Sequence, residues 1–127
     1  FFQLQCKMKI IRRSKGKAVV IYIENVDDFT KFVLHSSDPV LVYFWADSNG
    51  LSRLLGKRLE EKIASRDGDI VMASVNIDWA GEVALEWNVR SVPLIVEFRK
   101  GMSERQLTGN TSDEELSSFI EKVVAAY

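Results

Sequence analysis

The side chains most often used for covalent and metal chemistry, cysteine and histidine, occur once each, as Cys6 and His35. One cysteine excludes an intramolecular disulfide, and the pair is too small a set for a zinc site of cysteine and histidine ligands. Neighbouring lysines lower the pKa of the Cys6 thiol slightly, but no activating partner is visible, so we expect it to be idle. We therefore expect no metal and no other cofactor.

The chain is long enough for one compact domain, with 127 residues of which 46% are hydrophobic and 28% charged. No stretch approaches the roughly 20 apolar residues of a membrane span, so we expect no integral membrane segment. The net charge is −1, which argues against a mainly electrostatic nucleic-acid binder.

Positive charge is concentrated at the N-terminal end of the chain. Six of the 17 basic residues lie in residues 1–17, and the first acid is Glu24. A basic, acid-free arm with interspersed apolar residues is typical of a mitochondrial targeting segment or its remnant, with a solvated tail as the alternative. We therefore divide the chain into an arm, residues 1–17, and a domain, residues 18–127. We expect a mitochondrial location, with a cytoplasmic one as the alternative.

Hydrophobic periodicity predicts alternating strands and helices. We expect strands at residues 18–22, 40–46, 70–77, 94–98 and 105–108, and helices at 26–33, 51–63, 81–87 and 113–124. Asn25 is a predicted N-cap, and Ser112 with Glu115 forms a predicted capping box. The order βαβαβαββα implies a three-layer α/β/α fold with a central mixed sheet, because parallel crossovers come first and a hairpin closes the sheet.

Four short segments carry a family resemblance, in the order and spacing of that βαβαβαββα pattern. They are residues 39–46 (PVLVYFWA), 71–78 (VMASVNID), 89–93 (VRSVP) and 98–101 (FRKG). Together they resemble the thioredoxin family over residues 26–124, and Gly56 with residues 58–60 resembles its mitochondrial members. The resemblance implies the thioredoxin fold.

The resemblance also places the family's two redox cysteines, of the motif Cys-Gly-Pro-Cys, at residues 49–52. Here that segment reads Asn49-Gly50-Leu51-Ser52. In the family, a thiolate at the helix N-terminus attacks a disulfide and the second thiol resolves the mixed disulfide. An amide is not a nucleophile and an unactivated hydroxyl has a very high pKa, so we expect no disulfide exchange.

Two further family positions differ in the same direction. The family's buried aspartate, which assists proton transfer, and the lysine beside it fall on Tyr43 and Ser74 here. A buried charge costs several kcal/mol of effective desolvation, so we interpret the loss of thiols, acid and lysine as the loss of one unit. We expect the Tyr43 hydroxyl to find a buried partner, with Ser74 as the candidate.

Pro93 matches the family's cis-proline, and the backbone before it, here Val92, pairs in the family with an extended substrate peptide. Such strand addition needs no cysteine. The resemblance therefore implies a peptide groove. Its expected residues are Trp45, Ser48, Gly50, Ser91, Val92, Pro93 and Gly109.

The leading hypothesis is a protein-binding or scaffolding module without a redox-active dithiol, whose partner is a protein or peptide. The alternative is a thiol-related enzyme, with a glutathione-transferase-like or residual oxidoreductase role, in which Ser52 at a helix N-terminus would hydrogen-bond a bound thiolate. We expect Trp87 to be core. For Trp79 we favour a partly buried position over an exposed contact surface.

Overall fold

The computed structural model describes residues 7–13 and 15–127. Its strands are β1 (Lys7–Arg13), β2 (Gly16–Ile23), β3 (Val40–Trp45), β4 (Ile70–Asn76), β5 (Leu94–Arg99) and β6 (Met102–Thr108). Its helices are α1 (Val26–Phe29), the π-helical turn η1 (Thr30–Leu34), α2 (Gly50–Ser65), α3 (Gly81–Glu86) and α4 (Asp113–Val124).

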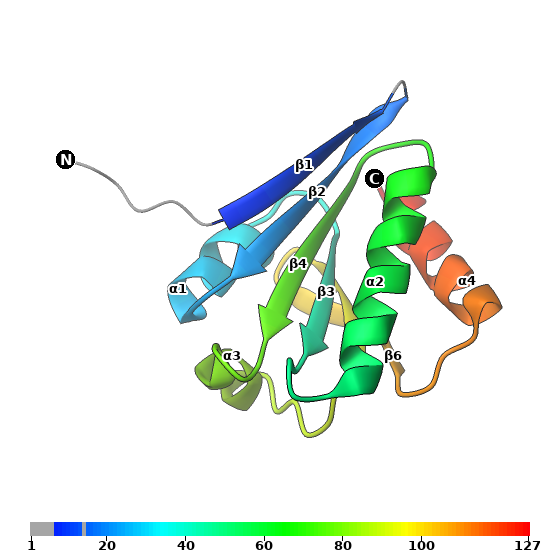
Figure 1. Ribbon diagram of the computed structural model, residues 1–127. Coiled ribbons are helices and arrows are strands. Elements are labelled where there is room, and N and C mark those ends of the chain that lie inside the picture. The colour runs from blue at the N-terminus through cyan, green and yellow to red at the C-terminus, as the bar shows by residue number, and fades with distance from the viewer. Residues whose placement is uncertain (1–6, 14) are drawn as a thin grey trace.

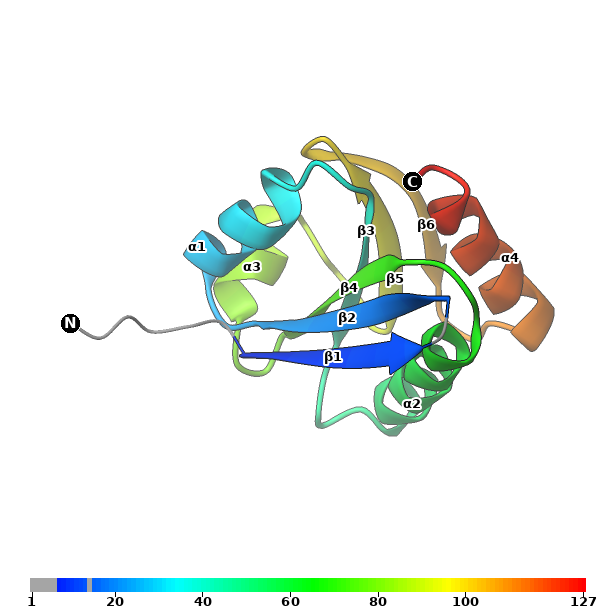
Figure 2. The same ribbon diagram turned by 90° about the horizontal axis from the view of Figure 1, so that it is seen from above.

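The strands form one mixed sheet in the order β1-β2-β4-β3-β5-β6 (Figure 1). β2, β4 and β3 run parallel, while β1 and β5 are antiparallel to their neighbours and β6 is antiparallel to β5. Seen from above, α1 and α3 lie on one side of the sheet and α2 and α4 on the other (Figure 2). The predicted α/β/α layering with a central mixed sheet is therefore confirmed.

The helix starts follow from local sequence signals. Asn25 caps α1 by accepting the N–H of Asp28, and the predicted capping box is present, because the Ser112 and Glu115 side chains each accept the other's backbone N–H. α2 buries one face, since residues three and four apart share a side of a helix. That face consists of Ser52, Leu55, Leu59 and Ile63.

Two elements differ from the sequence prediction. β1 precedes the predicted first strand and pairs with β2, so the βαβαβαββα order holds only from β2 onward. The alternating lysines and apolar residues of β1 resemble the pattern of a basic arm, and this concealed the strand. The predicted helix 26–33 becomes α1 followed by a wider turn, because the His35 N–H donates to the Thr30 carbonyl, five residues earlier.

The segment separated as a basic arm therefore contributes to the sheet. Lys9 of β1 forms an ion pair with Glu60 of α2, with 2.7 Å between Nζ and Oε1. Cys6 lies outside the described residues. No helix in the described part of the chain is long and apolar enough to cross a membrane.

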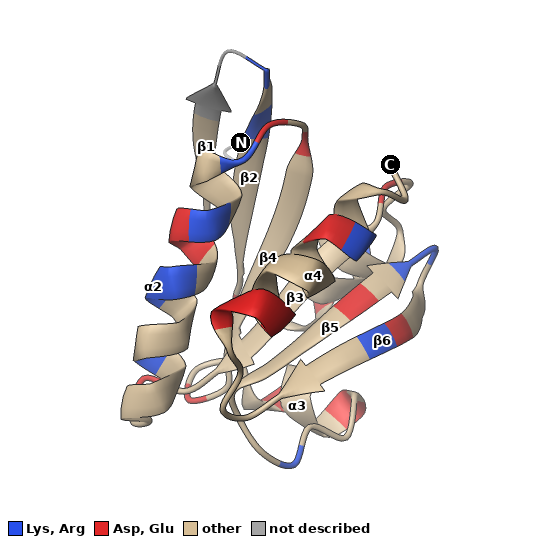
Figure 3. Cartoon of the chain, turned by 90° about the vertical axis from the view of Figure 1, so that its right-hand side faces the viewer, with Lys and Arg blue, Asp and Glu red and all other residues tan. Residues whose placement is uncertain are grey.

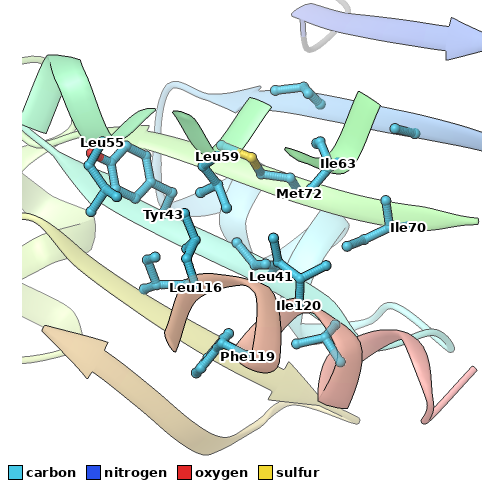
Figure 4. Packing of buried hydrophobic residues seen from close by; sticks show 14 residues of the cluster. Leu41, Tyr43, Leu55, Leu59, Ile63, Ile70, Met72, Leu116, Phe119 and Ile120 are labelled. Atoms are coloured by element: carbon cyan, nitrogen blue, oxygen red, sulfur yellow. The ribbon is translucent and has the colours of Figure 1, made fainter. Parts of the chain in front are cut away.

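The core has two parts, one on each face of the sheet. Between α2, α4 and the sheet, aliphatic side chains pack around Tyr43 and Leu41 (Figure 4). On the α1 and α3 face, the rings of Phe29, Phe98 and Trp87 are in mutual contact, with centroids 5.1 to 5.7 Å apart. Apart from the buried Glu97, most charged side chains lie outside these cores, with cations and acids along α2 and acids at the first turn of α4 (Figure 3). The α2 and α4 surfaces are joined there by an Arg58–Asp113 ion pair.

Candidate functional site

The four predicted motif positions lie at the start of α2, just beyond the end of β3. Asn49 is the N-cap, and its Oδ1 accepts the backbone N–H of Ser52 at 2.9 Å. The Asn49 N–H in turn donates to the carbonyl of Ala46 at 3.0 Å. The side chain at the first motif position is therefore used to begin the helix, and an amide in this place supplies no nucleophile.

Ser52, at the other end of the motif, points inward. It is 0% exposed, and its Oγ has no hydrogen-bond partner among the described residues. A buried hydroxyl without a partner is uncommon, because the group loses its bonds to water on folding. Leu51, by contrast, is exposed on the outer side of the same turn.

Tyr43 connects the central strand to this turn. Its hydroxyl donates to the backbone carbonyl of Ser52, and its ring packs so closely on Gly56 that a Cβ there would lie 3.1 Å from Cε2. Burial raises the pKa of Tyr43 well above its ordinary value. The phenol therefore stays protonated at neutral pH, and it is a donor that ties β3 to α2.

The expected hydrogen bond between the Tyr43 hydroxyl and Ser74 is not formed, so that prediction is wrong. Ser74 lies opposite Tyr43 in the parallel register, but its Oγ accepts the indole Nε1–H of Trp45 at 2.9 Å. The Tyr43 side chain is long enough to extend past Ser74 to α2. The shorter Ser74 side chain bonds to the Trp45 indole instead. Tyr43 and Ser74, at which the resemblance places the family's acid and lysine, thus form two separate hydrogen bonds.

The predicted groove residues lie at the end of β3, just before the start of β5 and just after the end of β6. The Val92–Pro93 peptide bond is cis, and the Pro93 carbonyl accepts the N–H of Gly109 at 3.3 Å. Pro93 is buried, Val92 half-buried and Ser91 exposed. The backbone N–H and C=O of Val92 have no partner among the described residues.

Two cavities lie at this edge of the sheet, and the predicted groove residues Trp45 and Ser91 line different ones. Trp45 and Ser52 line a cavity of about 310 Å³ between α2 and the sheet. Ser91 lines another, of about 260 Å³, over β5 and β6. Ser48 lies outside both linings and is exposed, and its N–H donates to the Asp78 carboxylate at 3.0 Å.

Two tryptophans flank α3, and their environments are opposite. Trp87 is in the aromatic core, as predicted, with its ring 5.1 Å from that of Phe98. Trp79 is 81% exposed, so the expectation that it is partly buried is wrong. The turn after β4 holds it there, because the Trp79 N–H donates to the Asn76 carbonyl. The preceding run of strand residues gave no signal for the direction of this side chain.

The comparisons with known proteins agree with this geometry. The family model described as Thioredoxin matches residues 20–122. The probable thioredoxin-2 of Caenorhabditis elegans is 41% identical over 120 residues, which cover 94% of this chain and 83% of that protein. The mitochondrial thioredoxin of Bos taurus is 34% identical over 80% of this chain, which matches 61% of that protein's length.

Solved structures show the same architecture. A mutant thioredoxin of Halobacterium salinarum aligns with a TM-score of 0.70 and 25% identity, over 83% of this chain and 90% of its own. The thioredoxin of Malassezia sympodialis aligns with a TM-score of 0.73 over 97% of both chains, at 22% identity. With the fold, the ordered segments and the relatives in agreement, the chain belongs to the thioredoxin family.

Proposed function

We propose that this thioredoxin-family protein binds an extended segment of another protein and does not reduce disulfides. The observation that carries the proposal is the residue set at the start of α2, Asn49 to Ser52, which contains no thiol. Disulfide reduction by this family's route takes two electrons from two thiols and leaves an intramolecular disulfide. With Cys6 as its only cysteine, the chain cannot form that product.

The alternative, an enzyme that uses Ser52 to stabilise a bound thiolate, has less support. Ser52 is fully buried, and its backbone N–H is already bonded to the Asn49 side chain. The Ser52 N–H is therefore not available to a bound thiolate, and the hydroxyl alone would have to stabilise the negative charge.

Peptide binding is supported by the backbone at Val92. Its N–H and C=O have no partner among the described residues, and the side chain is half-buried beside the Pro93–Gly109 hydrogen bond. An extended peptide satisfies such groups by adding a short antiparallel or parallel strand. Nearby exposed apolar side chains, Leu51 and Trp79, add surface for a partner to cover.

Disulfide reduction is tested with insulin, whose reduction by dithiothreitol produces turbidity. We expect the wild-type protein to leave the rate at that of the buffer control. A variant with Asn49→Cys and Ser52→Cys together should show weak activity, because Tyr43 and Leu51 still differ from the family's residues. Wild-type acceleration above the control would contradict the proposal, and family-level rates in the double variant would show that a tyrosine at position 43 is no obstacle.

Peptide binding is tested with a displayed library of random extended peptides, selected on the full chain. We expect selected peptides to lose affinity for a Val92→Asp variant, because the new charge lies where the peptide backbone must approach. Met102→Asp is the matched control, since this exposed side chain lies on β6, away from Val92. Equal binding to wild type and Val92→Asp would remove the groove from the proposal.

We also propose a mitochondrial location and a targeting role for residues 1–17. The basic, acid-free composition of that arm and the resemblance to mitochondrial relatives support both. The test is imaging of the full chain with a C-terminal reporter, beside a variant with Lys7, Lys15 and Lys17 changed to Gln. A diffuse cytosolic signal for the unchanged chain would favour the cytoplasmic alternative.

A further inference from the structure

The cavity between α2 and the sheet is a chamber with a buried floor and a charged mouth. Its volume is about 310 Å³, within the range of small-molecule sites. Buried side chains form the floor, namely Tyr43, Ser52, Met72 and Ser74. Exposed charged side chains form the mouth, namely Asp47, Arg53 and Lys57.

The floor offers hydrogen-bond donors that the protein leaves unused. The Ser52 Oγ has no partner among the described residues. The Ser74 Oγ accepts the Trp45 indole N–H at 2.9 Å and retains its own proton, for which no acceptor lies in the described part of the chain. Buried hydroxyls are normally satisfied, so two spare donors in one wall favour a guest that carries an acceptor.

The charges at the mouth leave one cation in excess. Glu60 in the cavity wall is paired with Lys9, at 2.7 Å. Arg53 and Lys57 then face a single acid, Asp47. Arg53 donates to the Asp47 backbone carbonyl, while Lys57 has no ion pair within the described residues. The guest that balances this set carries one negative charge.

The remaining wall is apolar and partly flat. It consists of the rings of Tyr22, Tyr43 and Trp45 and the thioether of Met72. Aromatic walls favour a guest with a planar or slender apolar body, because stacked rings gain from both burial and geometry. The spare donors, the excess cation and the aromatic walls therefore all favour the same chemical class of guest.

We propose that this cavity binds a small organic monocarboxylate with an apolar body, its carboxylate held by Lys57 and the hydroxyl-bearing wall. The site is separate from the groove at Val92, and binding here requires no partner protein. Trp45 lines the cavity, so occupancy is reported by its indole.

The test is a titration of the isotope-labelled full chain with phenylacetate, monitored through the indole N–H resonances. A ligand of about ten heavy atoms is expected to bind with a millimolar dissociation constant. We expect the Trp45 signal to shift, because its N–H donates to Ser74 in the cavity wall, while the Trp87 signal on the other face of the sheet stays in place. Phenylacetamide, which has the same shape and no charge, should bind at least about tenfold more weakly.

The variants separate charge from shape. Lys57→Gln should weaken phenylacetate binding about tenfold and leave phenylacetamide unchanged. Lys62→Gln is the matched control on the same helix, since Lys62 faces Asp113 and lies outside this cavity's lining. The proposal is overturned by equal affinity for acid and amide, by an unaffected Lys57→Gln variant, or by no Trp45 shift at millimolar phenylacetate.

Discussion

The two faces of the sheet are covered by different kinds of side chain. The α1 and α3 face is held by contacts between aromatic rings, in which Phe29 touches Phe44, Trp87 and Phe98. The α2 and α4 face contains Tyr43 with its hydroxyl bond to α2, and the buried Ser52, Ser74 and Glu97. In the described part of the chain, buried polar side chains are thus gathered on the face that carries the start of α2 and its cavity.

The difference indicates that the two faces of this small domain have different roles, one chiefly in stability and the other also in the candidate site. An apolar face stabilises by burial and tolerates no empty volume, whereas a polar face adds direction but must satisfy every buried group. Truncations on the first face should act on stability alone. Changes on the second face should act on stability less, and on the candidate site more.

The largest expected effect comes from Phe29→Ala on the aromatic face. Removing this ring leaves a cavity among three other rings, and such changes cost about 3–5 kcal/mol. Urea unfolding measures the loss, and the Trp45 indole resonance should stay where it is in wild type. A loss below about 1 kcal/mol, or a displaced Trp45 signal, would break the proposed separation of the faces.

The next effect comes from Glu97→Gln on the polar face. The Glu97 Oε2 accepts from Arg99 Nε at 2.6 Å, and Arg105 Nε lies 2.7 Å from Oε1 as an ion pair without hydrogen-bond alignment. The neutral amide keeps only one acceptor oxygen, so we expect a loss of about 1–3 kcal/mol in urea unfolding. Both arginines are about one-third exposed and can turn to water, which limits the loss.

The matched control is Glu104→Gln on the exposed side of β6, which should stay within about 0.5 kcal/mol of wild type. Equal losses for the two variants would mean that the buried carboxylate is no more than another surface charge.

A smaller effect is expected for Tyr43→Phe. The ring and its packing remain, and the only loss is the hydroxyl that donates to the Ser52 carbonyl, worth about 0.5–1.5 kcal/mol. Because that bond holds the first turn of α2 against β3, amide exchange at residues 50–53 should accelerate more than in α4. Uniform exchange across both helices would show that the hydroxyl does not act locally.

The smallest effect appears at alkaline pH. Burial raises the pKa of Tyr127 to about 12, and its hydroxyl donates to the Pro39 carbonyl and accepts the Val71 N–H. The unfolded pKa is about 10. A raised folded pKa adds stability that is complete below about pH 10 and is lost as pH rises towards 12.

Urea unfolding at several pH values from about 9 to 11 measures this slope, and Tyr127→Phe serves as the reference chain. The difference in stability between the two chains should shrink as pH rises. A constant difference would show that the hydroxyl does not titrate with folding.

Much of the fold follows from the sequence because its signals are local. The apolar run of β3, the caps at Asn25 and Ser112 and the turn at Lys100–Gly101 each act within a few residues. The sequence does not predict β1, because its charged residues dominate its pattern of polar and apolar side chains. The chain connecting β1 to its partner β2 is nevertheless short, and β2 begins at Gly16, where φ is +107°.

The site was less accessible to prediction because its contacts are long-range. The sequence located residues 49–52 beside the central strand, but not the inward position of Ser52 or the bond from Tyr43 to its carbonyl. The Trp45–Ser74 bond joins residues 29 positions apart. In the sequence, Glu97 is a single charged residue within a predicted strand. Its partner Arg105 becomes apparent only from the pairing of β5 with β6, which places the two residues opposite each other.

The added strand β1 also changes what the sheet offers to other molecules of its own kind. With β1 in place, the parallel strand β2 is no longer the border, and the new border carries exposed lysines at positions 7 and 9, of which Lys9 is paired with Glu60. Positive side chains along an open strand repel an identical strand approaching from a neighbour. We therefore expect the hairpin to oppose edge-to-edge pairing chiefly through Lys7, and concentrated salt should weaken this effect.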